Sequence, residues 1–182
     1  MYLHQGWLSD IVHKPSPNFN QRPVGVRPEL VVIHNISLPA GEFGTGCIEA
    51  LFCNTLDCSV HNSFADLLGL EVSAHLLIDR CGEATQFVSF DDRAWHAGVS
   101  TYQGRNNCND FSIGIELEGT DDLAYTDAQY GTLRQILALL RRHYGLADDA
   151  VVGHSDIAPG RKTDPGAAFD WVRISDVLNR SV

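Results

Sequence analysis

Two short, strongly apolar segments of the chain each end on a histidine. Residues 30–34 read LVVIH and residues 151–154 read VVGH. Runs of β-branched residues that close on a polar residue are typical of buried strands that deliver their last side chain to a site. The two segments therefore predict a sheet that carries His34 and His154 at the ends of two of its strands.

Further strands are indicated by the alternation of apolar and polar residues. Residues 74–79 and 85–88 flank a Cys-Gly turn and are predicted to form a β-hairpin. In residues 113–118 the apolar side chains occupy every second position. Because successive side chains of a strand point to opposite faces, Glu116 is predicted to point away from the apolar layer.

The clearest helix is predicted between Thr126 and Gly145. Thr126 begins a capping box with Gln129, and Gly145 suits the left-handed residue that closes a helix. A shorter segment, from Gly46 to about Asn54, also has helical composition. The expected buried stripe of the long helix consists of Tyr130, Leu133, Leu137, Leu140 and Tyr144.

The order of these elements predicts the fold class. Strands precede and flank helices without strict βαβ alternation, so we expect an α/β (mixed α+β) fold with a central mixed sheet flanked by helices. The 182 residues fit a single domain, residues 1–182. Prolines among polar residues in the first 29 positions predict an arm, residues 1–29, wrapped over a core, residues 30–182.

The composition narrows the class of partner. A net charge of -10 and a pI near 5.1 repel polyanions, so nucleic acid is not expected to bind. The first residues show no secretory pattern, and no apolar stretch approaches the ~20 residues that span a bilayer. Five cysteines without a C-x-x-C pair argue against a disulfide framework. We expect a cytoplasmic monomer without a membrane partner.

His34, His154 and Asp164 form a candidate metal site. Asp164 lies in a polar loop, residues 158–166, that follows the second histidine. Zinc hydrolases use three protein ligands and one open position for water, and two imidazoles with one carboxylate leave the site net positive. Spacing alone gives weak support, because His34 lies far away in sequence and a histidine at a strand end is more often structural.

Two further residues fit the other requirements of amide hydrolysis. The reaction needs a base for the water and a donor for the developing oxyanion. Glu116, on a rigid strand, fits the first role, and Lys162, two residues before Asp164, fits the second. The alternative for each residue by itself is an ordinary solvated charge.

Six segments spread over the chain carry a family resemblance. They are residues 32–37 (VIHNIS), 73–75 (SAH), 93–98 (RAWHAG), 112–116 (SIGIE), 152–154 (VGH) and 161–166 (RKTDPG). Their order and spacing resemble the type 2 N-acetylmuramoyl-L-alanine amidase superfamily, which includes the peptidoglycan recognition proteins. Residues 6–8 and 15–17 are similar as well, so the resemblance covers essentially the whole chain.

The resemblance implies a zinc enzyme with a peptidoglycan-recognition-protein-like mixed sheet. The implied reaction is hydrolysis of the amide between 1,6-anhydro-N-acetylmuramic acid and L-alanine, in peptidoglycan recycling. The expected cofactor is Zn²⁺ and the expected partner is an anhydromuropeptide. In this resemblance the zinc ligands are His34, His154 and Asp164, the catalytic base is Glu116, and the residue that stabilises the oxyanion is Lys162.

The resemblance also concerns the substrate groove. Asn35, Trp95 and Arg161 match positions that line it, and their chemistry suits an amide, a sugar face and a carboxylate or carbonyl respectively. His75 and His96 lie in the matched motifs too. We expect them to be buried, hydrogen-bonded structural histidines that do not bind the metal.

Two alternative functions stay open. Some members of the superfamily bind muropeptides without cutting them, but these typically lack one zinc ligand. A periplasmic amidase that acts on polymeric peptidoglycan would carry an export signal. The chain departs from the family pattern at Asn62, Ser63 and Glu71, so the preference for the stem peptide is left open.

Overall fold

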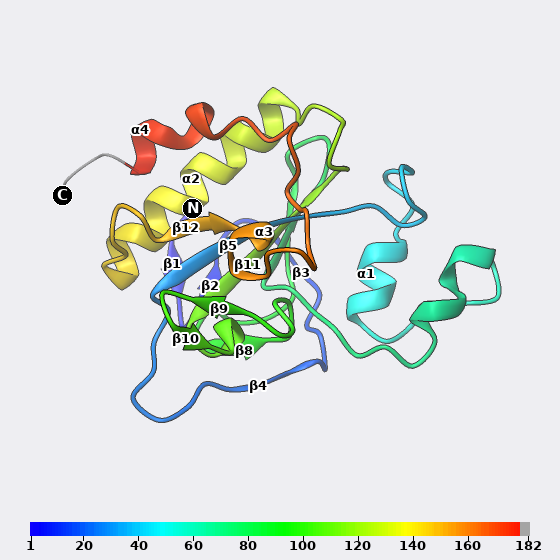
Figure 1. The fold of residues 1–182 in the computed structure, drawn as a ribbon, viewed down its shortest axis with the longest axis horizontal. Coiled ribbons are helices and arrows are strands. Elements are labelled where there is room, and N and C mark those ends of the chain that lie inside the picture. The colour runs from blue at the N-terminus through cyan, green and yellow to red at the C-terminus, as the bar shows by residue number, and fades with distance from the viewer. Residues whose placement is uncertain (179–182) are drawn as a thin grey trace.

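A six-stranded mixed sheet forms the centre of the protein (Figure 1). The computed structural model describes residues 1–178. In spatial order the strands are β12 (Val151–Gly153), β5 (Leu30–Ile36), β11 (Ser112–Glu118), β6 (Leu76–Ile78), β7 (Ala84–Gln86) and β3 (Val12–His13). The first four are parallel, β7 is antiparallel to β6, and β3 is parallel to β7. The predicted mixed sheet and the β6–β7 hairpin are confirmed.

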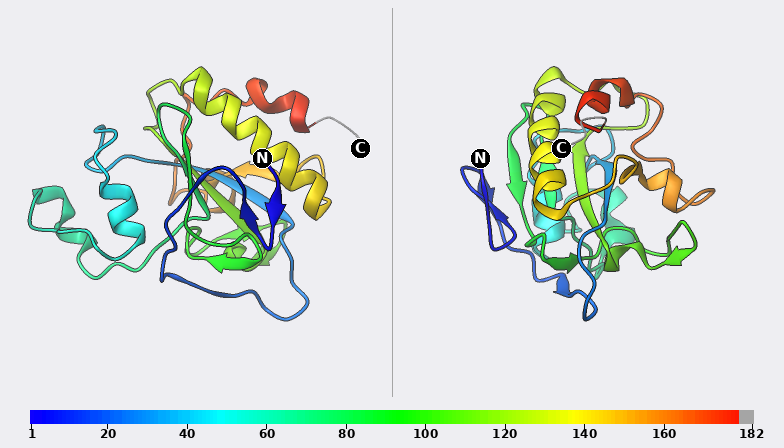
Figure 2. Two further views of the ribbon diagram at one scale, coloured as in Figure 1. Left: turned by 180° about the vertical axis from the view of Figure 1, so that it is seen from behind. Right: turned by 90° about the vertical axis from the view of Figure 1, so that its left-hand side faces the viewer.

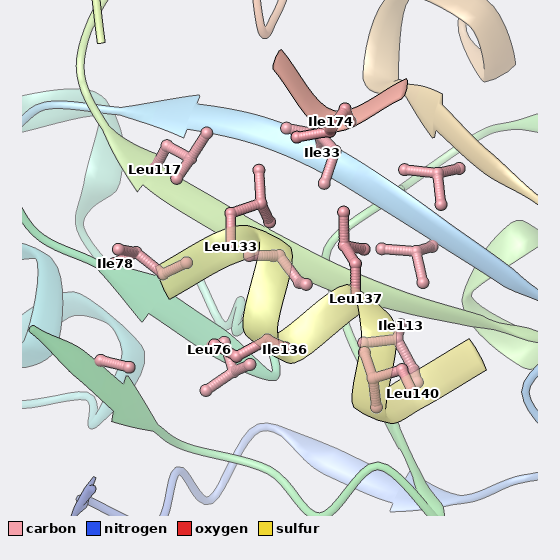
Figure 3. Packing of buried hydrophobic residues seen from close by; sticks show 14 of the residues in the cluster. Ile33, Leu76, Ile78, Ile113, Leu117, Leu133, Ile136, Leu137, Leu140 and Ile174 are labelled. Atoms are coloured by element: carbon pink, nitrogen blue, oxygen red, sulfur yellow. The ribbon is translucent and has the colours of Figure 1, made fainter. Parts of the chain in front are cut away.

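One face of the sheet is covered by the long helix α2 (Asp127–Tyr144). Its predicted capping box is present, because Thr126 and Gln129 each accept a hydrogen bond from the other's backbone N–H. Gly145 closes the helix with a φ of 68°. The predicted stripe is buried, and Figure 3 shows its leucines, with Ile136, packed against side chains of β5, β11 and β6. Within the described residues, neither α2 nor another helix is long and apolar enough to cross a membrane. Two short helices follow near the end of the chain, η3 (Trp171–Ile174) and α4 (Ser175–Leu178).

The opposite face of the sheet receives the alternate side chains of each strand. In β5, Val31 and Ile33 pack under α2, whereas Leu30 and Val32 pack on the other side. His34 continues the second set and therefore points away from α2. Figure 2 shows α1 and the segment after it projecting from one end of the sheet. The short helices outside the α2 layer are α1 (Cys47–Phe52), η1 (Asn62–Leu67), η2 (Cys108–Asp110) and α3 (His154–Ile157).

The first 29 residues run along the outside of the sheet. β1 (Leu3–His4) pairs with β2 (Trp7–Leu8), β3 forms an edge of the central sheet, and β4 (Phe19–Gln21) pairs with β8 (Asp92–Ala94). The half-buried guanidinium of Arg22 binds the segment to the body of the protein. It donates hydrogen bonds to the backbone carbonyls of Phe90, Asn109, Asp110 and Ser112.

Two element boundaries differ from the sequence-based prediction. β5 does not end at His34 but continues to Ile36, because it stays paired with β11 to that point. His154 does not end a strand but begins α3, because the Asp156 carboxylate accepts the Gly153 N–H at 2.7 Å and starts the helix there. A small hairpin that was not predicted consists of β9 (Thr101–Tyr102) and β10 (Arg105–Asn106).

Candidate metal centre and active site

The site lies on the sheet face opposite α2, where the parallel strands β5, β11 and β12 end. His34 and Glu116 are paired in register on β5 and β11. His154 directly follows β12, and β12 is hydrogen-bonded to β5. Strand order therefore brings together two histidines that lie far apart in the sequence. As predicted, Glu116 points away from the apolar layer, since its neighbours Ile115 and Leu117 pack under α2.

Asp164 reaches the histidines from the loop after α3. Its backbone carbonyl accepts a hydrogen bond from the Ser155 N–H at 2.9 Å. The next carbonyl, that of Pro165, accepts one from the Tyr125 hydroxyl at 2.7 Å. The loop is therefore attached both to α3 and to the segment before α2, which fixes the position of the carboxylate.

The three predicted metal ligands converge on one point. His34 Nδ1 lies 2.9 Å from His154 Nδ1 and 3.1 Å from Asp164 Oδ2, and His154 Nδ1 lies 3.0 Å from Asp164 Oδ2. Both imidazoles are buried. Ligands of a tetrahedral zinc ion, with bonds of about 2.0–2.1 Å, lie roughly 3.3 Å apart. The group can therefore hold a metal ion after small outward shifts of its ligand atoms.

The hydrogen bond of His154 Nε2 leaves the lone pair of Nδ1 directed at the point where the three ligands converge. His154 Nε2 lies 3.2 Å from the carbonyl oxygen of Ala97. A carbonyl only accepts, so Nε2 carries the proton and Nδ1 of the neutral ring is unprotonated. An imidazole lone pair and the Asp164 carboxylate oxygen are both acceptors, and a cation between them satisfies both. The chemistry of the donor set therefore fits a metal ion.

Glu116 is the buried carboxyl group beside these ligands. It is 9% exposed, and its Oε2 has no hydrogen-bond partner among residues 1–178. Burial first, and the Asp164 carboxylate second, raise the pKa of Glu116 well above its ordinary value, while the charge of Lys162 opposes this shift. A carboxyl group with a raised pKa and a free oxygen suits proton transfer.

A cavity of about 250 Å³ lies over these groups. All five predicted metal and catalytic residues line it, together with Asn35 and Trp95. Arg161 does not line it, because its guanidinium donates hydrogen bonds of 2.7 Å to the carbonyls of Ala97 and Val99. The full lining consists of His34, Asn35, Ile36, Leu51, Phe52, Leu70, Val72, Ser73, Trp95, His96, Glu116, His154, Lys162 and Asp164.

Asn35 and Trp95 are each oriented by a partner that the sequence analysis missed. The Asn35 amide donates to Asp121 Oδ1 at 2.7 Å, and Trp95 Nε1 donates to Asn20 Oδ1 at 2.7 Å. Asn20 belongs to β4, so the N-terminal segment supports one wall of the site. No pattern in the sequence marks Asn20 or Asp121, because both act through contacts that only the fold creates.

His75 and His96 are hydrogen-bonded and lie outside the three-ligand group. His75 Nδ1 accepts the Gly114 N–H at 3.0 Å, and its Nε2 lies 3.2 Å from the Asp92 carbonyl oxygen. His96 differs, because its Nδ1 lies 2.9 Å from Nε2 of the ligand His34. This contact was not predicted.

We expect the free energy of unfolding of the metal-free protein to fall as the pH drops from about 6.5 to about 4. Burial lowers the pKa of His34 to about 4, and it lowers the pKa values of His75 and His96 well below 6.5. In this pH range the unfolded chain binds protons that the folded chain does not bind. The contribution of these histidines to the free energy of unfolding is therefore fully present above about pH 6.5 and is lost with acidification. Urea denaturation at a series of pH values measures this loss.

Glu116 gives an opposite contribution to this pH dependence. Because its pKa is raised, the folded chain keeps a proton that the unfolded chain releases above about pH 4.5, so this contribution to stability decreases as the pH rises. The substitution Glu116→Gln removes the opposing contribution and is expected to steepen the loss on acidification. If the free energy of unfolding stayed constant between about pH 6.5 and 4 in both the wild type and Glu116→Gln, the assignment of these histidines as buried and neutral would be wrong.

Comparison with known proteins identifies the family. The sequence profile of the N-acetylmuramoyl-L-alanine amidase family, Amidase_2, matches residues 24–167. The chain belongs to this family. The amidase is 56% identical over 181 residues to the 1,6-anhydro-N-acetylmuramyl-L-alanine amidase AmpD of Enterobacter cloacae, and the match covers 100% of this chain and 97% of the relative.

Two solved structures extend the comparison. The crystal structure of a selenomethionine derivative of AmpD matches with a TM-score of 0.95 at 55% identity and covers 97% of this amidase and 99% of that chain. AmpDh3 from Pseudomonas aeruginosa, solved in complex with anhydromuramic pentapeptide, matches with a TM-score of 0.60 at 31% identity and covers 85% of this amidase and 61% of that chain. The predictions of the fold and of a hydrolase of this family are confirmed.

Proposed function

We propose that this amidase uses Zn²⁺ to hydrolyse the amide between 1,6-anhydro-N-acetylmuramic acid and L-alanine in free muropeptides, as a cytoplasmic monomer. AmpD of Enterobacter cloacae is named for this bond, and AmpDh3 was solved with an anhydromuramic pentapeptide. One observation carries the proposal: the convergence of His34, His154 and Asp164 beside the free carboxyl oxygen of Glu116. All of these groups come from one chain, which supports action as a monomer.

We propose that the whole chain, residues 1–182, acts as one amidase domain. The catalytic core, residues 30–182, contains every proposed metal ligand and both proposed catalytic residues. The arm, residues 1–29, contributes Asn20, which holds Trp95 at the wall of the cavity.

Zinc is the metal that best suits the three ligands. His34 and His154 supply neutral nitrogens and Asp164 supplies one anionic oxygen, so the centre stays net positive. When bound, Zn²⁺ supplies a Lewis acid that polarises the amide carbonyl and lowers the pKa of water from 15.7 to about 7. His34 on β5, His154 at the start of α3 and Asp164 in the attached loop are kept in place by these elements.

Glu116 and Lys162 handle the proton and the charge in the proposed reaction. Glu116 takes the proton of the attacking water through its free oxygen and returns it to the departing alanine nitrogen, since expulsion of an amine needs an acid. The raised pKa of Glu116 suits both transfers. The Lys162 ammonium, in the lining of the same cavity, stabilises the negative charge that develops on the carbonyl oxygen.

We propose that Asn35 and Trp95 contribute to substrate binding from the wall of the cavity, and that Arg161 contributes by holding one side of the site. Asn35 and Trp95 line the cavity, and each donates a side-chain N–H to a partner, which leaves the face of the indole to pack against a sugar ring. Arg161 lies in the loop next to Lys162, where its bonds to the carbonyls of Ala97 and Val99 hold one side of the site.

Substitution of Trp95 by alanine is expected to raise KM about five-fold, with a smaller effect on kcat. The lost contact is worth about 1 kcal/mol, and it is made in the ground state as well as in the transition state. Trp171→Ala is the control, because Trp171, the first residue of η3, packs against Phe169 and does not line the cavity. Steady-state kinetics with an anhydromuropeptide measure both variants, and an unchanged KM in Trp95→Ala would contradict the proposed contact.

Mass spectrometry of reaction products tests the proposed function. The zinc-loaded protein is incubated in parallel with a purified anhydromuropeptide and with intact murein. Release of the free stem peptide from the anhydromuropeptide, with little release from murein, supports the proposal. Efficient release from intact murein would favour an amidase of the polymeric wall, and binding without product would favour a muropeptide-binding module.

A further inference from the structure

His96 lies between a metal ligand and the strand β11. Its Nδ1 is 2.9 Å from His34 Nε2, and its Nε2 is 3.1 Å from the hydroxyl oxygen of Ser112. The Ser112 hydroxyl is in turn 2.6 Å from the carbonyl oxygen of Cys108. Four groups therefore form one hydrogen-bonded chain from a buried backbone carbonyl to His34.

The direction of every hydrogen bond in this chain follows from its fixed end. The Cys108 carbonyl only accepts, so the single hydroxyl proton of Ser112 points to it. The Ser112 oxygen must then accept from His96 Nε2–H, which leaves Nδ1 of that neutral ring unprotonated. His96 Nδ1 accepts from His34 Nε2–H, and the lone pair of His34 is thereby placed on Nδ1, the atom that faces His154 and Asp164.

The strand β11 is shaped to hold the His96 ring in this position. Ser112, Gly114 and Glu116 lie on one face of the strand, because side chains alternate. A Cβ atom at Gly114 would lie 2.4 Å from His96 Cγ, far inside contact distance. Glycine therefore leaves the space that the imidazole fills, while Ser112 anchors the ring and Glu116 reaches the cavity.

We propose that His96, oriented by Ser112, is a positioning residue that fixes the tautomer of His34 and thereby makes Nδ1 of His34 a metal ligand. The inference rests on the metal site of the proposed function. A ligand histidine is generally oriented by the hydrogen bond of its second nitrogen, and loss of such a partner typically lowers metal affinity by about 10–100-fold. Without His96, the His34 proton can occupy Nδ1 and donate to Asp164 Oδ2, 3.1 Å away, where it competes with the metal.

Competition for Zn²⁺ with a chromophoric chelator tests the proposal. His96→Phe keeps a ring in the space beside Gly114 but can neither accept nor donate, and we expect it to bind Zn²⁺ about 10–100-fold more weakly than the wild type. Ser112→Ala leaves His96 in place without its anchor, so we expect a smaller loss in the same direction. Wild-type affinity in His96→Phe would overturn the proposal.

Ser100→Ala is the matched control for loss of a buried hydroxyl. Ser100 also donates to a carbonyl, that of Gly98, and accepts a backbone N–H, that of Cys108, but its hydroxyl is not hydrogen-bonded to His96. We expect its Zn²⁺ affinity to equal that of the wild type. If Ser100→Ala lost as much Zn²⁺ affinity as Ser112→Ala, the loss would not be specific to the hydrogen-bonded chain through His96, and the role proposed for Ser112 would be wrong.

Nitrogen-15 NMR of the histidine rings tests the tautomer without any variant. In the metal-free wild type near neutral pH, we expect a proton on Nε2 and none on Nδ1 for both His34 and His96, and a change of the His34 Nδ1 resonance when Zn²⁺ is added. The opposite tautomer of His34 would overturn the inference even if the protein binds zinc and cuts its substrate. Failure of the wild type to bind Zn²⁺ would instead count against the proposed function.

Discussion

Replacement of Glu116 by glutamine is expected to lower kcat by about 10²–10⁴-fold, the usual contribution of a positioned general base. Glutamine keeps the size of the side chain but can neither take the proton of the water nor return one to the leaving nitrogen. Within residues 1–178, Glu116 makes no hydrogen bond through Oε2 and is not among the three ligand groups, so Zn²⁺ affinity should change little. Steady-state kinetics and chelator competition measure the two effects separately.

Glu118 provides the matched control for this substitution. It lies on the same face of β11 and is also buried, but its carboxylate accepts the backbone N–H groups of Gly44 at 2.6 Å and Arg80 at 3.3 Å. Glu118→Gln is therefore expected to reduce stability and to leave kcat nearly unchanged. If Glu116→Gln retained wild-type kcat, or if both variants lost kcat equally, the assignment of Glu116 as the base would be wrong.

Much of the fold could be predicted because local sequence patterns decided it. The capping box of Thr126 and Gln129 and the left-handed Gly145 are local features, and the helix between them forms as expected. Alternation in β11 predicted the direction of Glu116, because the period of a strand is fixed by its geometry. The same alternation places Ser112 and Gly114 on the site face, a feature that the sequence analysis did not use.

The geometry of the site could not be predicted, because it depends on contacts between distant segments. The approach of His34 to His154 follows from the pairing of β5 with β12, and strand order cannot be calculated from spacing. The contact of Asn20 with Trp95 arises in the same way. Arg161 illustrates the converse, because a matched motif gave its position in the chain but not the direction of its side chain.

Removal of the metal is expected to lower amidase activity by at least about 10³-fold, because Lewis-acid stabilisation contributes several kcal/mol to the transition state and each 1.36 kcal/mol is a factor of ten. Dialysis against a chelator tests this, and Zn²⁺ but not Mg²⁺ should restore the activity, since nitrogen ligands suit zinc. Zn²⁺ at 100 times its Kd should also raise the free energy of unfolding by about 2.7 kcal/mol.

The substitution Asp164→Asn separates the effect of losing the metal from other effects of the chelator. The amide keeps the shape of the side chain but removes the one anionic ligand, so we expect neither activity nor stabilisation at a Zn²⁺ concentration that saturates the wild type. Asp170→Asn is the control, because Asp170 accepts the Val172 N–H at the start of η3, away from the cavity, and it should respond to Zn²⁺ as the wild type does. Full activity of the chelated wild type would show that the convergence of His34, His154 and Asp164 has another purpose. Activity restored in Asp164→Asn at that concentration would show that the two imidazoles are sufficient to hold the ion, and that the carboxylate is not a required ligand.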